Sequence, residues 1–83
     1  MLRICARHGA RSVRLFGAVV RGEAGADSEV DILVEFEADR GLWDRVALTQ
    51  ALEDLLGRKV EVVSEKGLQP HIRDRILEQA VPL

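Results

Sequence analysis

The segment from Glu29 to Glu37 constrains the fold more than any other part of the chain. Hydrophobic and acidic residues alternate along it with a period of two, which is the spacing of side chains on a β-strand. One face would carry Val30, Ile32, Val34 and Phe36, and the other Glu29, Asp31, Leu33, Glu35 and Glu37. The sequence therefore predicts a strand with a buried apolar face and a second face that is rich in acids.

Shorter patterns predict the elements on either side of this strand. Gly9 and Gly57 are suited to end helices, because glycine readily adopts the left-handed conformation of a C-terminal cap. Pro70 is suited to the first position of a helix. In chain order, we expect a helix over 2–8, a strand over 12–16, a loop over 17–28, a helix over 42–56, a strand over 58–64 and a helix from Pro70.

This order of helices and strands predicts a small α/β (α+β) fold. About three principal strands would form the sheet, and helices would cover one of its faces. The other face would stay partly open to water, which suits the alternating acids. A length of 83 residues fits a single domain over 1–83.

The composition excludes several classes of protein. A formal net charge of −2 argues against direct nucleic-acid binding, which needs clustered cations. No apolar run approaches the roughly 20 residues that span a membrane. Cys5 is the only cysteine, which excludes an internal disulfide and favours a buried structural thiol. We therefore expect a soluble cytoplasmic protein.

Several conspicuous side chains are best interpreted as structural. Trp43 stands at the entry to the helix over 42–56 and is expected to be a packing anchor. His8 follows a short helix, where a cation is mildly favourable, so we expect it to cap that helix or to be solvated. Arg73 and Arg75 would form a solvated face of the last helix, or alternatively an interface with a partner.

The acids of the predicted strand suggest chemistry when a later acid is added to them. Side chains two residues apart on a strand lie roughly 7 Å apart on one face, so Glu29 and Asp31 would repel each other. Glu61, on the strand over 58–64, would join them if the two strands are neighbours. Three such carboxylates suit Mg²⁺, which prefers oxygen ligands and works with substrate phosphates. Taken alone, the same acids also fit a solvated strand face without a metal.

The residues that precede these acids form a recognisable sequence pattern together with them. The stretches LFGA at 15–18, RG at 21–22 and SEVDI at 28–32 resemble the signature of polymerase β-like nucleotidyltransferases. In that signature, a glycine turn after a strand is followed by ten residues and then by two acids separated by one hydrophobic residue. A third acid between hydrophobic residues comes later, as in VEV at 60–62. The stretches LVEF, LGRKV and RDRIL also resemble the minimal nucleotidyltransferases, the MNT group.

The resemblance implies a small mixed sheet, a set of site residues and a partner. It implies that Glu29, Asp31 and Glu61 are catalytic and bind Mg²⁺, with two ions per site. It also implies that Gly17, Ala18 and Arg21 bind the nucleotide, ATP or another NTP. By this resemblance the chain would be the antitoxin of a HEPN/MNT pair, which transfers AMP to a tyrosine hydroxyl of a HEPN-domain ribonuclease toxin in a hetero-oligomer.

Some residues depart from the family pattern. Ala18 stands where the family has serine or glycine, and Glu29 and Glu61 stand where aspartate is more usual. The extra methylene moves a carboxylate by roughly 1 Å, and such a displacement can lower a rate about 100-fold. These departures leave open a second interpretation, in which a weak or inactive site remains and the protein neutralises its partner by complex formation alone. A third is a small metal-binding or acidic-faced structural protein with no nucleotide role.

Overall fold

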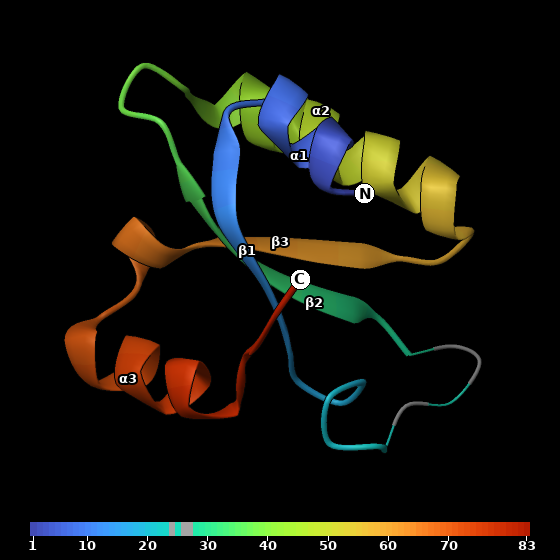
Figure 1. Ribbon diagram of the computed structural model, residues 1–83, viewed down its shortest axis with the longest axis vertical. Coiled ribbons are helices and arrows are strands. Elements are labelled where there is room, and N and C mark those ends of the chain that lie inside the picture. The colour runs from blue at the N-terminus through green and yellow to red at the C-terminus, as the bar shows by residue number, and fades with distance from the viewer. Residues whose placement is uncertain (24, 26–27) are drawn as a thin grey trace.

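The computed structural model describes residues 1–23, 25 and 28–83, so part of the predicted loop over 17–28 lies outside the described residues. The described residues form three α-helices, four strands and one short 3-10 helix, whose arrangement is shown in Figure 1. In chain order these are α1 (Leu2–Arg7), β1 (Ala10–Phe16), β2 (Val30–Phe36), α2 (Leu42–Leu56), β3 (Val60–Ser64), η1 (Glu65–Gly67), α3 (Pro70–Gln79) and β4 (Val81–Pro82).

The strands form one mixed sheet in the order β3-β2-β1-β4. β2 is parallel to β3 and antiparallel to β1, and β4 is antiparallel to β1. The predicted α/β fold with three principal strands is confirmed. The fourth strand, β4, was not predicted, because a segment of two residues is too short to show a periodic pattern.

β1 begins at Ala10, two residues before the predicted start. The register between β1 and β2 shifts between Arg11 and Arg14, and Ser12 has a φ of 53° within this irregularity. An inserted residue of this kind interrupts the alternation of faces along a strand. The sequence pattern therefore revealed only the part of the strand that follows the irregularity.

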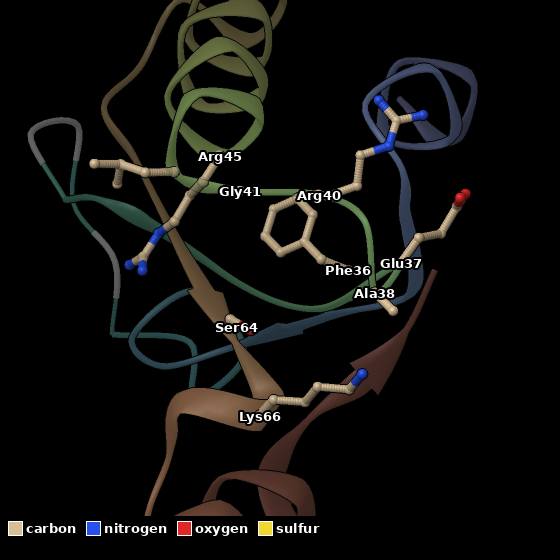
Figure 2. A pocket seen from close by; sticks show the side chains of 9 residues that line it. Phe36, Glu37, Ala38, Arg40, Gly41, Arg45, Ser64 and Lys66 are labelled. Atoms are coloured by element: carbon tan, nitrogen blue, oxygen red, sulfur yellow. The ribbon is translucent and has the colours of Figure 1, made fainter.

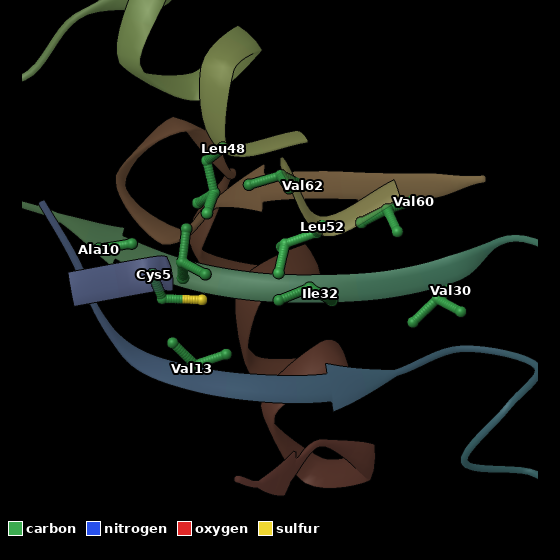
Figure 3. Packing of buried hydrophobic residues seen from close by; sticks show 10 residues of the cluster. Cys5, Ala10, Val13, Val30, Ile32, Leu48, Leu52, Val60 and Val62 are labelled. Atoms are coloured by element: carbon green, nitrogen blue, oxygen red, sulfur yellow. The ribbon is translucent and has the colours of Figure 1, made fainter. Parts of the chain in front are cut away.

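The hydrophobic core lies between one face of the sheet and the helices α1 and α2 (Figure 3). Leu48 and Leu52 of α2 are fully buried against this face, next to Ile32 and Val62. Burial of a leucine side chain stabilises a fold by about 2 kcal/mol. Cys5 of α1 is also fully buried, and this burial raises the pKa of its thiol, as expected for a structural cysteine.

The second face of the sheet is only partly open. Leu33 shares this face with Asp31, yet it is fully buried. η1 packs against β2, and an ion pair of 3.5 Å joins Glu65 of η1 to Arg14 of β1. α3 lies beyond the sheet, away from α1 and α2 (Figure 1). The face is therefore closed around Leu33 and accessible at its acidic end.

The helix ends follow the predicted signals. The Nδ1 of His8 lies 2.9 Å from the carbonyl oxygen of Ile4, so this side chain caps α1. Gly57 ends α2 with a φ of 66°, and its N–H donates to the backbone carbonyl oxygen of Glu53. Pro70 occupies the start of α3. Within the described part of the chain, no helix combines the length and the apolar character needed to cross a membrane.

The expectation for Trp43 was wrong, because 80% of this side chain is exposed. Trp43 precedes the buried Leu52 by nine residues along α2. At 3.6 residues per turn, this separation places the two side chains on opposite sides of the helix. The core stripe of α2 thus excludes Trp43, even though it is the largest side chain of the segment.

The start of α2 depends on the charge of Asp44. Its carboxylate accepts hydrogen bonds from the N–H of Gly41 at 3.0 Å and from Nη1 of Arg40 at 3.2 Å. The bond from Gly41, and then that from Arg40, lowers the pKa of Asp44. A carboxyl group with a lowered folded pKa stabilises the fold above its unfolded pKa, and this contribution is lost as the pH falls through the folded value.

We expect Asp44→Asn to lower the melting temperature at neutral pH. The difference from the unsubstituted protein should shrink as the pH falls below about 4, the unfolded pKa of aspartate, because the native carboxyl is then also neutralised. Thermal melts followed by circular dichroism, from neutral pH to below about pH 4, measure this difference in melting temperature. The exposed Asp54 of the same helix provides the control Asp54→Asn. If the melting temperature of Asp44→Asn stays below that of the unsubstituted protein by the same amount at every pH, the charge of Asp44 does not stabilise the start of α2.

Candidate active site

Three carboxylates converge where β2 and β3 begin. The parallel pairing of these strands places Asp31 directly opposite Glu61, and Glu29 stands just before β2. One carboxylate oxygen from each residue lies within 4.8 Å of the others. Asp31 is half-buried, whereas Glu29 and Glu61 are exposed. The sequence-predicted acids are thus brought together at the open end of the sheet face.

Gly17 lies against the middle acid of this cluster. β1 ends at Phe16, which pairs with Asp31, and the chain then turns at Gly17 with a φ of 77°. A Cβ atom at Gly17 would collide with the Asp31 carboxylate. Glycine is therefore required here twice, once for the backbone conformation and once for the close approach.

The turn after Gly17 is compact. The N–H of Arg21 donates to the Gly17 carbonyl at 3.1 Å, and the N–H of Glu23 donates to the Ala18 carbonyl at 2.9 Å. Ala18 is half-buried within this turn. These bonds close the turn on itself, and Gly17 places the start of the turn against Asp31.

The side chain of Arg21 is held by two partners. Its Nε lies 3.0 Å from the Glu23 carboxylate, and its Nη1 donates to Oε1 of Gln79 at 3.3 Å. Gln79 closes α3, and sequence reasoning did not single it out. A residue that enters a site from 58 positions away leaves no local pattern, so no sequence signal could have found it.

Burial and the neighbouring acids make the charge of Asp31 unfavourable. Burial raises the pKa of Asp31 most, followed by the nearby Glu61 and then Glu29, while Arg21 lowers it. Carboxylates that are crowded in this way are relieved by a cation. The oxygen donors, their mutual distances and this repulsion together fit a divalent cation such as Mg²⁺.

In metal-free buffer at neutral pH, we expect Asp31→Asn to raise the melting temperature. Asparagine keeps the shape of the side chain but removes a charge that burial and two acids disfavour. Glu35→Gln is the matched control, because Glu35 lies on the same strand beside Arg11, 3.6 Å away, and outside the cluster. Differential scanning calorimetry in the presence of a chelator measures both variants. A lower melting temperature for Asp31→Asn would contradict the repulsion.

A separate pocket lies at the other end of the sheet. It has a volume of about 280 Å³ and is bordered by Phe36, Gly41 and Ser64. Three cations also line it, yet Figure 2 shows that the charged ends of Arg40, Arg45 and Lys66 point to different sides. Arg40 is moreover paired with Asp44. Since these charges do not converge, the acidic cluster is the candidate active site.

The mixed sheet, the covering helices and the acidic cluster beside a glycine turn define a domain of the nucleotidyltransferase type. The sequence matches the family described as nucleotidyltransferase domain over residues 2–83. The chain belongs to this family. The resemblance that the residues suggested is therefore confirmed at the level of the family.

Two curated relatives are similar over most of their length. A candidate protein adenylyltransferase of Methanocaldococcus jannaschii is 38% identical over 81 residues, which is 98% of this chain and 87% of the relative. The protein adenylyltransferase MntA of Thermococcus cleftensis is 43% identical over 75 residues, which is 90% of this chain and 76% of the relative.

Solved structures share the same fold. A structure described as a minimal nucleotidyltransferase superposes with a TM-score of 0.91 at 55% identity, covering 99% of this chain and 84% of that one. A toxin–antitoxin structure with AMP-PNP superposes with a TM-score of 0.84 at 19% identity, covering 98% of this chain and 67% of that one. The second likeness establishes the fold alone.

Proposed function

We propose that this protein is a Mg²⁺-dependent nucleotidyltransferase that moves AMP from ATP to a hydroxyl group of a partner protein. The observation that carries the proposal is the convergence of Glu29, Asp31 and Glu61, whose carboxylate oxygens lie within 4.8 Å of one another. Similarity to protein adenylyltransferases at 43% and 38% identity supports the choice of AMP.

The three acids would hold the metal in this proposal. Glu29, Asp31 and Glu61 would each offer a carboxylate oxygen to Mg²⁺, with two ions per site. When bound, Mg²⁺ would neutralise phosphate charge and lower the pKa of the attacking hydroxyl. Because Asp31 lies between the other two acids and the glycine turn, it would contribute to both parts of the site.

The turn beside the acids would position the triphosphate. Gly17 allows the backbone to come close to the phosphates, and backbone N–H groups at Ala18 would donate to their oxygens. The cation of Arg21 is held near the cluster by Glu23 and Gln79, and would offset phosphate charge. The acceptor oxygen would bond to the α-phosphorus as the bond to the leaving pyrophosphate breaks, and the hydroxyl proton would pass to water.

We propose a HEPN-domain ribonuclease toxin as the acceptor, bound in a hetero-oligomer. The support is the resemblance to MNT antitoxins, together with the shared fold of a toxin–antitoxin structure that contains AMP-PNP. The modification would place AMP on a tyrosine hydroxyl of the toxin and so silence it. Chemistry of this kind depends mainly on positioning and charge neutralisation, which the turn and the acids would supply.

Neutralisation by binding alone is the alternative, motivated by Ala18, Glu29 and Glu61. The close fit of Gly17 against Asp31 favours an intact site, since binding alone does not require it. The double substitution Glu29→Ala and Asp31→Ala separates the two functions in cells that also produce the toxin. Loss of protection with the complex still formed is expected for the enzyme. Full protection by the double variant would support the binding module instead.

A further inference from the structure

Arg58 connects the turn after α2 to the loop that precedes the acidic strand. Its Nη2 atom donates to the carbonyl oxygen of Ser28 at 2.7 Å and to that of Gly25 at 3.0 Å. The Nε atom of the same guanidinium is buried. Hydrogen bonds from a charged donor are stronger than those between neutral groups. One side chain therefore fixes two backbone positions that lie about thirty residues away in sequence.

The two residues that offer these carbonyl groups, Gly25 and Ser28, are also bonded to each other. The N–H of Gly25 donates to Oγ of Ser28 at 2.8 Å, and the N–H of Ser28 donates to the Gly25 carbonyl at 3.2 Å. Arg58 thus holds two residues that are bonded to each other rather than a single carbonyl. Ser28 is followed directly by Glu29.

Glu29 depends on this anchor more than the other acids do. Asp31 and Glu61 are placed by the pairing of β2 with β3. Glu29 precedes the first residue of β2 and is exposed, so its position follows the backbone that leads into the strand. Val30, which follows Glu29, is held by a bond of 2.9 Å from its N–H to the Lys59 carbonyl. Ser28, which precedes Glu29, is held by Arg58.

We propose that Arg58 is a positioning residue for the acidic cluster. By holding the carbonyls of Gly25 and Ser28, it sets the place of the Glu29 carboxylate relative to Asp31 and Glu61, and thereby the affinity of the cluster for a divalent cation. The inference deepens the proposed function and rests on it for the identity of the bound group. Partners that hydrogen-bond directly to a metal ligand change metal affinity 10- to 100-fold when they are replaced. Arg58 acts through the backbone one residue before Glu29, so we expect an effect near the lower end of this range.

Three variants of the full chain test the inference. Arg58→Met keeps the length of the aliphatic stem but has no donor, Arg58→Lys keeps one charged donor group, and Arg45→Ala removes an exposed arginine at the other end of the sheet. Mn²⁺ binding is measured by electron paramagnetic resonance, and binding of ATP with Mg²⁺ by calorimetry. We expect Arg58→Met to weaken both by about 10-fold, Arg58→Lys to fall between, and Arg45→Ala to match the unsubstituted protein.

Hydrogen exchange provides a readout that does not depend on a ligand. The amide of Ser28 should exchange faster in Arg58→Met, while amides in the middle of β2 keep their protection. Unchanged Mn²⁺ affinity and unchanged exchange in this variant would overturn the inference. If Arg58→Met fails to fold, Arg58→Lys decides by the same two measurements. If the unsubstituted protein binds neither Mn²⁺ nor ATP, the proposed function fails, and hydrogen exchange alone decides the role of Arg58.

Discussion

Asp31→Asn is expected to lower the rate of nucleotide transfer about 100- to 1,000-fold, the loss typical when one preorganised electrostatic group of an active site is removed. Asp31 is paired with Glu61 across the parallel strands and touches the glycine turn on its other side. An amide in its place keeps the shape but loses the charge that would hold the metal. Transfer of label from ATP to the partner protein measures the rate.

The loss of activity should come with a gain in stability. We expect the same variant to melt at a higher temperature without metal, because the charge that the proposed reaction would use is unfavourable in the folded protein. Such a trade-off is typical of active sites. Glu35→Gln should transfer nucleotide at the unsubstituted rate. An Asp31→Asn protein that keeps more than a tenth of the activity would show that the acids do not form the catalytic centre.

Gly17→Ala is expected to have the second-largest effect. The added Cβ collides with the carboxylate of Asp31, so either the turn or the acid must move. A non-glycine residue at the φ of 77° also costs about 1–2 kcal/mol of stability. Since a displacement near 1 Å can cost about 100-fold in rate, we expect a loss of that order together with weaker binding of ATP and Mg²⁺.

Gly22→Ala separates the two causes. Gly22 lies in the same loop with a φ of 72°, and a Cβ there would meet no atom of the described residues within 4 Å. Gly22→Ala should therefore lose only the stability that its positive φ costs, whereas Gly17→Ala should in addition lose binding and activity. Calorimetric titration with ATP and Mg²⁺ compares them. Equal binding by the two variants would rule out a functional contact between Gly17 and Asp31.

The alternation around Asp31 was enough to predict β2 and its acidic face. Periodicity also predicted α2, from an apolar stripe of Leu48, Leu52, Leu55 and Leu56 with Ala51. Leu48 and Leu52 are fully buried, whereas Leu55 and Leu56 are exposed, so the stripe that packs on the core is narrower than the pattern predicted. The convergence with Glu61 was predictable only on the condition that β2 and β3 are neighbours, because periodicity shows which face a residue takes and not which strand lies beside it. That condition is met in the structure.

Other parts of the site could not be predicted from local patterns. The contacts of Arg58 with Ser28 and of Arg21 with Gln79 join residues 30 and 58 positions apart, and the first is made to a backbone carbonyl that any residue would offer. Trp43 was misplaced for a different reason. Its hydrophobic character suggested burial, but its angular position on α2 directs it to solvent.

The proposed chemistry is tested most directly by the fate of the two ends of ATP. The protein is incubated with Mg²⁺ and the proposed partner toxin, with ATP labelled either at the α-phosphate or at the γ-phosphate. We expect label from the α-phosphate on the toxin, label from the γ-phosphate in released pyrophosphate, and neither after the metal is chelated. A toxin that forms the complex yet receives no label from the α-phosphate would contradict nucleotide transfer by Glu29, Asp31 and Glu61.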